Sequence, residues 1–503
     1  MADGGAIRLG PGVTLTFDRG FMAPPHQVFS DATEARSRIV FNSTAQSHGH
    51  PEWWGARGGD PGVDCAPALA MCVEACAVTR LQACDYWIGS TWKIQLNGRV
   101  VEGVNGDADG AEPITRILTN SPSIDMVLVG PDEQPTPGSM RGFVGFIRLK
   151  HLTVARATAP DAPPTGVTPG GPCGVRLQWV NISSLEDIWC KESTNGFYIR
   201  GTVYCKLCGC HAFRSTASRR AGNDYFAGFL QDNSPKAGLN SGNASLYYDS
   251  CGVSGGFQGM STSYGILTIG GFTDTFIDKM ETSGIQQGLV FNGAAQGVEY
   301  PSENLMVTNC VIDTPVVGLR VTAPGSQRTA VTVSGCYFGI ALPSAQAGIL
   351  IDHCSGAVTL TGNQLISSQA APAAVGLAIR DSDGVCAQGN IYTDLANPIV
   401  LERANNCRLG DTVNVSRPGL GGSAAVSLAS SNRNIVDCVV HGAPPAYGAG
   451  ASLRASSFNE VRCTGLDPAA LRGGAARKLV ADGAEIRTAG AFGRGNLATG
   501  IMD

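Results

Sequence analysis

The chain has 503 residues, of which 43% are hydrophobic, only 15% are charged and 66 are glycine. This length allows one large repetitive domain or two to three ordinary ones, and the composition excludes a disordered or mainly helical chain. The formal net charge is −5, and no basic stripe is interleaved with aromatic residues, so no nucleic-acid partner is expected.

The N-terminal sequence has none of the features of an export signal. Residues Met1–Gly5 lack a basic region followed by an apolar stretch, and no run of about 18 apolar residues is present to cross a bilayer. We therefore expect a protein that is made in a cytoplasm and does not insert into a membrane.

The 17 cysteines are spread along the whole chain, and their number is odd. This distribution predicts reduced thiols in a core rather than a disulfide framework. The local group Cys205, Cys208 and Cys210 has no second pair at zinc-binding spacing. No metal and no cofactor are expected.

A short pattern recurs through the second half of the chain at an average interval of about 25 residues. Apolar residues stand five and three positions before a register point and two positions after it, as Val331, Val333 and Phe338 do around Cys336. The register points are Cys310, Cys336, Asn363, Asn390, Asp411, Cys438 and Cys463, preceded by Met280 and Cys251, with Cys210 and Cys190 expected to begin the series. This alternation predicts a short strand, a sharp bend and another short strand.

A further short strand is predicted in each repeat, beginning with glycine. The segments are 288–291, 318–321, 348–351 and 376–379. Coils of two or three strands would stack at about 4.8 Å and pair their strands in parallel. The fold class predicted is therefore all-β, a single-stranded right-handed parallel β-helix whose cysteine and asparagine register points form an internal ladder.

The front of the chain predicts short strands followed by a helix. Asp64 is placed to cap an amphipathic stretch that ends near Cys76, and a helix there would cover the open end of the first coil. Four parts are expected: a small β region at 1–50, an entry segment and capping helix at 51–100, the β-helix at 101–467, and a C-terminal tail at 468–503 that either wraps around neighbouring chains or frays.

The run Trp53–Gly58, with Asp64 and the helix after it, resembles the entry segment of the pectate-lyase-like superfamily, in the branch of phage tailspikes and polysaccharide-degrading enzymes. The usual segment has Gly-Asp-Gly and two further Asp residues, whereas this chain has Gly58-Gly59-Asp60 and then only Asp64. The resemblance is specific at 51–76 and extends as a pattern to about residue 465. It implies a homotrimer in a virion tail, with bacterial surface polysaccharide and other tail proteins as partners.

The period is interrupted between Cys210 and Cys251 by a segment that mixes aromatic and polar residues. Sugar rings present apolar faces and hydroxyl edges, so such a mixture is typical of a sugar site. The predicted substrate-binding residues are Asp224, Tyr225, Phe229, Asp232 and Tyr248. An ordinary polar surface loop is the alternative interpretation.

Carboxylates recur two positions before the register points. Asp249 and Asp278 occupy this position in a polar column, and the column predicts them about 4.8 Å apart on neighbouring coils. Glu281 and Asp313 are expected on the adjacent surface, and residues 279–284 resemble a segment that recurs in phage tailspikes. Glycoside hydrolysis uses two carboxyl groups, about 5–5.5 Å apart for retention or about 6.5–9.5 Å for inversion. Asp249, Asp278, Glu281 and Asp313 are thus the candidate catalytic residues; an acidic ladder that caps turns is the alternative.

The leading functional hypothesis is a bacteriophage tailspike or tail fibre that binds a host capsule or O-antigen and hydrolyses it. A non-catalytic glycan-adhesion spike, or a structural tail protein, is the second hypothesis. A polysaccharide lyase acting on a uronate-containing substrate is the third, because the fold alone does not determine the chemistry.

Overall fold

The structure is a computed structural model that describes residues 6–18, 20–30, 38–42, 48–106, 111–133, 135, 142–160, 171–215, 225–234, 243–255, 262–295, 298–299, 302–314, 316–325, 329–340, 347–367, 374–416, 424–442, 451–454, 460–464, 477–479 and 497–498. The chain divides into two compact units, Met1–Ser261 and Thr262–Asp503. Among the described residues, no helix has the length and apolar character needed to cross a membrane.

The first unit contains a 3-10 helix, η1 (Pro51–Trp54), one α-helix, α1 (Ala66–Ala75), and a long series of short strands. The strands are β1 (Ile7–Arg8), β2 (Thr14–Phe17), β3 (Phe29–Ser30), β4 (Arg38–Phe41), β5 (His48–Gly49), β6 (Val78–Arg80), β7 (Asp85–Trp87), β8 (Trp92–Ile94), β9 (Val100–Glu102), β10 (Arg116–Thr119), β11 (Val127–Val129), β12 (Val144–Gly145), β13 (Arg148–Arg156), β14 (Cys173–Gln178), β15 (Val180–Lys191), β16 (Asn195–Arg200), β17 (Val203–Cys208), β18 (His211–Arg214), β19 (Tyr225–Asp232), β20 (Ala244–Asp249) and β21 (Gly252–Gly255).

Helix α1 packs against β6 and β8 through the buried side chains of Leu69, Cys72 and Val73. The residue at the N-cap is Cys65 rather than the expected Asp64. Asp64, one position earlier, accepts hydrogen bonds at Oδ1 from the backbone N–H of Ala66 (3.0 Å) and of Gly89 (2.9 Å), and so ties the start of the helix to a neighbouring segment. The predicted helix is therefore present. Its role as a cap of the β-helix stays a prediction, as do the homotrimer and the four-part division of the chain.

The second unit consists of short strands in the described residues. They are β22 (Thr262–Ile269), β23 (Thr275–Asp278), β24 (Glu281–Ser283), β25 (Gln287–Asn292), β26 (Ala294–Ala295), β27 (Val298–Glu299), β28 (Asn304–Thr308), β29 (Val311–Thr314), β30 (Val317–Thr322), β31 (Ala330–Ser334), β32 (Tyr337–Ile340), β33 (Ala347–Asp352), β34 (Ala357–Thr361), β35 (Gln364–Ser367), β36 (Val375–Arg380), β37 (Val385–Thr393), β38 (Asn397–Glu402), β39 (Arg408–Val415), β40 (Val426–Ala429), β41 (Ile435–Gly442), β42 (Ala451–Arg454), β43 (Glu460–Thr464), β44 (Arg477–Leu479) and β45 (Leu497–Ala498).

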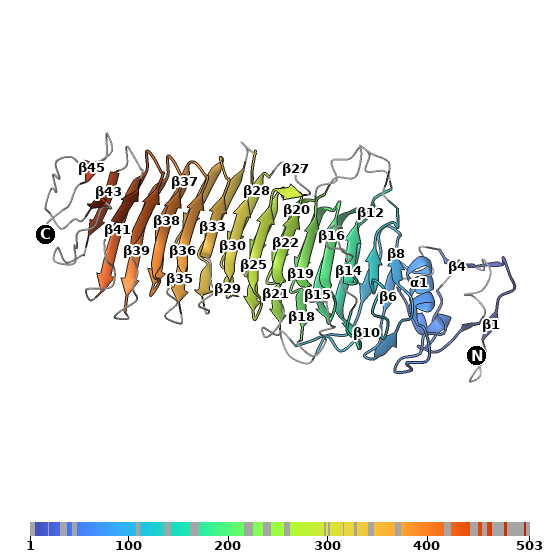
Figure 1. The fold of residues 1–503 in the computed structure, drawn as a ribbon. Coiled ribbons are helices and arrows are strands. Elements are labelled where there is room, and N and C mark those ends of the chain that lie inside the picture. Colours follow the sequence, from blue (N-terminus) through green and yellow to red (C-terminus); the bar gives the residue numbers. More distant parts are fainter. Residues whose placement is uncertain are drawn as a thin grey trace. The chain divides into compact units, whose positions relative to one another are not determined.

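Each coil supplies two or three strands, and the strands of the coils pair in parallel with their equivalents in the next coil (Figure 1). Two pairings are antiparallel instead, that of β26 with β27 and that of β42 with β44. The predicted glycine-led strands stack in register, so that Leu289 lies beside Leu319, Leu319 beside Ile349, and Ile349 beside Leu377. These leucine and isoleucine side chains are buried. The chain is therefore a parallel β-helix, as the repeat predicts.

The register points of the second unit form a buried ladder between coils. The backbone N–H of Cys336 donates to Asn363 Oδ1 (3.0 Å), that of Asn363 to Asn390 Oδ1 (3.0 Å), and that of Asn390 to Asp411 Oδ1 (2.9 Å). Each side chain thus binds the sharp bend of the preceding coil, which explains why asparagine recurs there.

The cysteines of the described residues are reduced thiols, most of them buried. Cys210 aligns with Cys251, since the flanking pairs are Cys208 with Asp249 and His211 with Gly252. Cys190, however, pairs with Ala212 rather than with Cys210. The series therefore does not begin at Cys190, because the spacing of that coil shifts this cysteine by two positions.

Asp411 gives the ladder a pH dependence. Burial raises the pKa of its carboxyl, although it accepts hydrogen bonds from Asn390 and from the Tyr392 hydroxyl (3.0 Å). Because the pKa of Asp411 is higher in the folded than in the unfolded protein, its carboxyl contributes most to the free energy of unfolding at low pH. This contribution is lost as the pH rises from the pKa of the unfolded protein, about 3.9, through the pKa of the folded protein.

We predict that Asp411→Asn, which continues the asparagine ladder without a buried charge, raises the free energy of unfolding at pH 7 by about 1 kcal/mol. The gain should shrink towards pH 4, and urea unfolding at both pH values measures it. An equal gain at the two pH values would contradict the titration argument.

Candidate functional site

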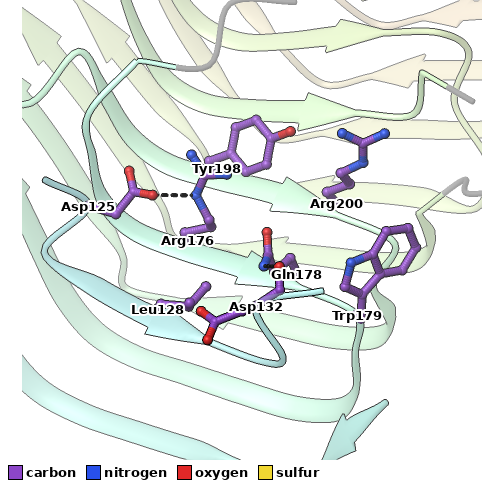
Figure 2. A pocket seen from close by; sticks show the side chains of 8 residues that line it. All are labelled: Asp125, Leu128, Asp132, Arg176, Gln178, Trp179, Tyr198 and Arg200. Atoms are coloured by element: carbon purple, nitrogen blue, oxygen red, sulfur yellow. Dashed lines mark hydrogen bonds and ion pairs between the residues drawn. The ribbon is translucent and has the colours of Figure 1, made fainter. Parts of the chain in front are cut away.

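The first unit carries a cavity of about 310 Å³ on the outer face of the sheet β8–β11–β14–β16–β19 (Figure 2). Its lining is mostly polar and consists of Asp125, Leu128, Asp132, Arg176, Gln178, Trp179, Tyr198 and Arg200. Strand alternation produces this face, because the intervening residues Val175, Leu177 and Ile199 point into the core.

Parallel register arranges the strand residues of this face in two columns. One column holds Leu128, Arg176 and Tyr198, and the other holds Gln178, Arg200 and Asp232. Neighbours within a column lie one coil apart, about 4.8 Å. Side chains from three coils therefore meet in one small space.

Arg176 is held between an anion and an aromatic ring. Its Nε lies 2.7 Å from Asp125 Oδ2, and its guanidinium carbon lies 4.4 Å from the centroid of the Tyr198 ring. Figure 2 shows Asp125 and Arg176 joined in this way, with the Tyr198 ring beside them. Stacking on the ring leaves the edge of the guanidinium as its hydrogen-bonding surface.

Asp232 anchors the second column. It is 1% exposed, accepts a hydrogen bond from the Tyr198 hydroxyl (2.6 Å), and lies 3.4 Å from Nη1 of Arg200. Burial and then the Asp232 charge raise the pKa of Tyr198, so its hydroxyl stays protonated and donates. Arg200 Nη2 also donates to the Ser234 carbonyl (3.1 Å), which fixes the guanidinium.

Trp179 forms one wall at a bend of the chain. Its backbone adopts φ 55°, and its ring lies over Gly201, where an added Cβ would come within 2.2 Å of it. Glycine is thus required at 201. The guanidinium of Arg200 lies 5.9 Å from the Trp179 ring centroid, and Gln178 Nε2 donates to the Pro131 carbonyl (2.6 Å) at the same rim.

None of the residues that line this cavity is among the predicted site residues. The pairs Arg176/Gln178 and Tyr198/Arg200 recur after 22 positions, each with one core residue between its two polar ones. The sequence signal that could have indicated this cavity is the presence of large polar and aromatic residues at alternate positions of strands that are otherwise buried.

The predicted substrate-binding residues do not form one site. Asp224 lies outside the described residues, Tyr225 is half-buried at the start of β19, and only Asp232 contacts the cavity residues. Phe229 and Tyr248 are 0% and 1% exposed. These two rings therefore lie in the core and not at a surface site. Tyr225–Asp232 is a regular strand rather than a loop, in which Phe229 stacks on Phe197 (ring centroids 4.7 Å apart), and Tyr248 packs edge-on against Phe229 (5.3 Å).

Two of the four candidate catalytic carboxylates are held by polar partners. Asp249, in the first unit, lies 3.0 Å from Lys206 Nζ. Asp278, in the second unit, accepts hydrogen bonds from Asn309 Nδ2 (2.9 Å) and the Thr308 hydroxyl (2.8 Å), and these bonds lower its pKa. Such contacts are typical of a carboxylate that stabilises a bend. The close approach of Asp249 and Asp278 stays a prediction.

The outward column that was predicted is present in the second unit. Its members pair in register in the order Asp278, Thr308, Ser334, Thr361 and Gln388.

Glu281 and Asp313 are exposed on the outer face of β24 and β29. Glu281 pairs with Val311 and Asp313 with Ser283, so the two carboxylates stand diagonally on adjacent coils. Their Cα atoms are then about 8 Å apart, a spacing of the same size as the separation of about 6.5–9.5 Å between carboxyl groups in inverting hydrolysis. The Asp313 carboxylate lies over Gly339 of the next coil, where an added Cβ would be 2.6 Å from Oδ1.

One group of side chains has the donor set for a cation: Asp352, His353 and Asp381, whose ligating atoms lie within 4.8 Å of one another. Arg403 already donates to both carboxylate oxygens of Asp381 (2.5 and 2.8 Å). The guanidinium therefore occupies one of the two carboxylates of this group, and we assign no metal to it.

No protein-family model matches the chain, and no curated protein matches it. Solved structures do resemble it. A double mutant of the tailspike protein of E. coli bacteriophage HK620 in complex with a pentasaccharide is 13% identical over 81% of this chain and 73% of that chain, with a TM-score of 0.57. A second HK620 tailspike mutant, in complex with a hexasaccharide, gives the same coverage and a TM-score of 0.58.

The surface adhesin PfbA of Streptococcus pneumoniae is 11% identical over 90% of this chain and 99% of that chain, with a TM-score of 0.51. At these identities the likeness concerns the fold alone. It agrees with the parallel β-helix described above.

The buried position of Asp232 predicts unequal effects of removing two carboxylates. Asp232→Ala strips the partner from Arg200 and Tyr198 in the interior and should lower the free energy of unfolding by about 3–5 kcal/mol. Asp132→Ala removes an exposed partner of Lys93 (2.8 Å) and should cost less than about 1 kcal/mol. Urea unfolding compares them, and similar losses would be inconsistent with this account.

Proposed function

We propose that this protein is a bacteriophage tailspike or tail-fibre protein that binds a bacterial surface polysaccharide, a capsule or an O-antigen, in the cavity of the first unit. One observation carries the proposal: adjacent coils bring the planar hydrogen-bonding groups of Arg176, Gln178 and Arg200 together in one cavity, against the buried rings of Tyr198 and Trp179. The planar groups suit the hydroxyl edges of sugars, and the rings hold these groups in position.

The likeness to known proteins supports the same proposal. The HK620 tailspike mutants were solved with a pentasaccharide and a hexasaccharide, and PfbA is a surface adhesin. On this proposal the chain acts in a virion tail, as a homotrimer attached to other tail proteins.

Cavity variants test glycan binding. A bacterial glycan array identifies the best ligand, and calorimetry measures its affinity for the variants. Arg176→Ala should raise Kd at least about tenfold, because the stacked guanidinium is lost, which corresponds to about 1.4 kcal/mol. Arg116→Ala is the matched control: Arg116 makes a comparable ion pair with Asp85 (2.6 Å) outside the cavity and should leave Kd unchanged. Equal Kd values for Arg176→Ala and the native protein would refute this site.

We further propose that Glu281 and Asp313 of the second unit hydrolyse a polysaccharide substrate, independently of the binding proposed in the first unit. Their exposure and diagonal placement leave room for a water molecule between the two carboxyl groups, as inversion requires. One carboxyl group would protonate the leaving oxygen, and the other would activate the water. Tyr337, which pairs with Val311 on the next coil and is 36% exposed, offers a ring beside them. Asp278, held by Thr308 and Asn309, has no catalytic role in this proposal.

The hydrolase proposal predicts that Glu281→Gln and Asp313→Asn each lower the release of reducing ends by at least about 100-fold while binding is retained. Asp278→Asn should keep most of the turnover. Binding by the native protein without any reducing ends would instead support the adhesion spike, and products that absorb as unsaturated uronates would support a lyase.

A further inference from the structure

We infer that the cavity of the first unit selects uncharged sugar units over acidic ones; the inference rests on the proposed glycan binding there. The cavity and the partners of its lining residues contain three cationic side chains and three carboxylates, and each cation is already paired with one carboxylate. The pairs are Arg176 with Asp125 (2.7 Å), Arg200 with Asp232 (3.4 Å) and Lys93 with Asp132 (2.8 Å). Their charges sum to zero.

An acidic sugar would have to compete with carboxylates that the protein itself supplies. A sugar carboxylate that displaced Asp232 from Arg200 would leave Asp232, which is 1% exposed, as an uncompensated buried charge. Leaving a buried charge without its partner costs several kcal/mol. Because the paired charges of the cavity sum to zero, its attraction for a ligand anion is too weak to offset this cost.

The same pairs suit hydroxyl groups. A guanidinium has five N–H donors and a carboxylate about four acceptor positions, so each ion pair keeps hydrogen-bonding capacity beyond its own contact. A sugar hydroxyl both donates and accepts. Two neighbouring hydroxyls can thus bind one arginine and one aspartate together, with no change in the charge of either.

Hydrogen bonds to the surrounding backbone hold the Asp125–Arg176 pair in place. Asp125 Oδ1 accepts the backbone N–H of Cys173 (3.0 Å). Arg156, which is 4% exposed, donates to the carbonyl of Ser121 (2.7 Å), to that of Cys173 (3.0 Å), and to that of Ile124, the residue before Asp125. The backbone that carries Asp125 is thus fixed, and Arg176 is stacked on Tyr198. Separating Asp125 from Arg176 to admit an anion would therefore be costly.

Matched ligands test the selectivity. Uronate-containing bacterial oligosaccharides are compared with the same oligosaccharides after chemical reduction of their carboxyl groups, which changes the charge and keeps the linkage. We expect the reduced forms to bind at least about tenfold more tightly, with Kd nearly independent of NaCl between about 50 and 500 mM, because no net charge is exchanged. Tighter binding of the native acidic forms, lost in Arg176→Ala, would overturn the inference and leave the proposed glycan site intact.

A charge variant provides the second measurement. Asp125→Asn keeps the shape and an acceptor for Cys173 but leaves Arg176 without its carboxylate, so the ratio of affinities should shift at least about tenfold towards the acidic forms. Asp85→Asn, which frees Arg116 outside the cavity, should leave the ratio unchanged. An unchanged ratio in Asp125→Asn would also overturn the inference. If neither charged nor reduced oligosaccharides bind the native protein, the proposed function itself fails, which is a different outcome from a reversed preference.

Discussion

The fixed register between parallel strands of successive coils is the constraint on which every other feature depends. Once one residue of a coil is placed, its equivalents above and below follow at a constant spacing, and their side chains share the same orientation. The buried asparagine ladder at 363 and 390 and the polar column headed by Asp278 are both consequences. The cavity is another, because its two columns bring together groups that are 22 to 50 or more positions apart in the chain.

The repeat made the fold predictable, and in the second unit it also made the register predictable. The column from Asp278 through Thr308 to Gln388 follows directly from counting, since each coil there has a similar length. In the first unit the coils differ in length, and counting no longer shows which way a residue points. Phe229 and Tyr248 were misplaced for this reason, as was Cys190 at the start of the series.

The cavity escaped prediction for a related reason. Arg176 and Tyr198 become neighbours only when the bend at Trp179, with its positive φ, sets the length of the turn between sheets. A tryptophan is an unusual residue for that conformation, which glycine adopts more readily and does adopt at Gly201 in the next coil. Local sequence rules therefore placed no bend there, and the alternate polar residues had no evident common surface.

The buried thiols carry a consequence for how such a chain must be made. Burial raises the pKa of Cys205 and of Cys354 to about 12 and that of Cys407 to about 11, so in a closed coil these sulfurs are hardly nucleophilic. A coil that has not yet closed has no such protection, and its cysteines regain ordinary reactivity. Disulfides formed before the coils close would therefore compete with stacking, whereas closing the coils protects Cys205, Cys354 and Cys407 from oxidation.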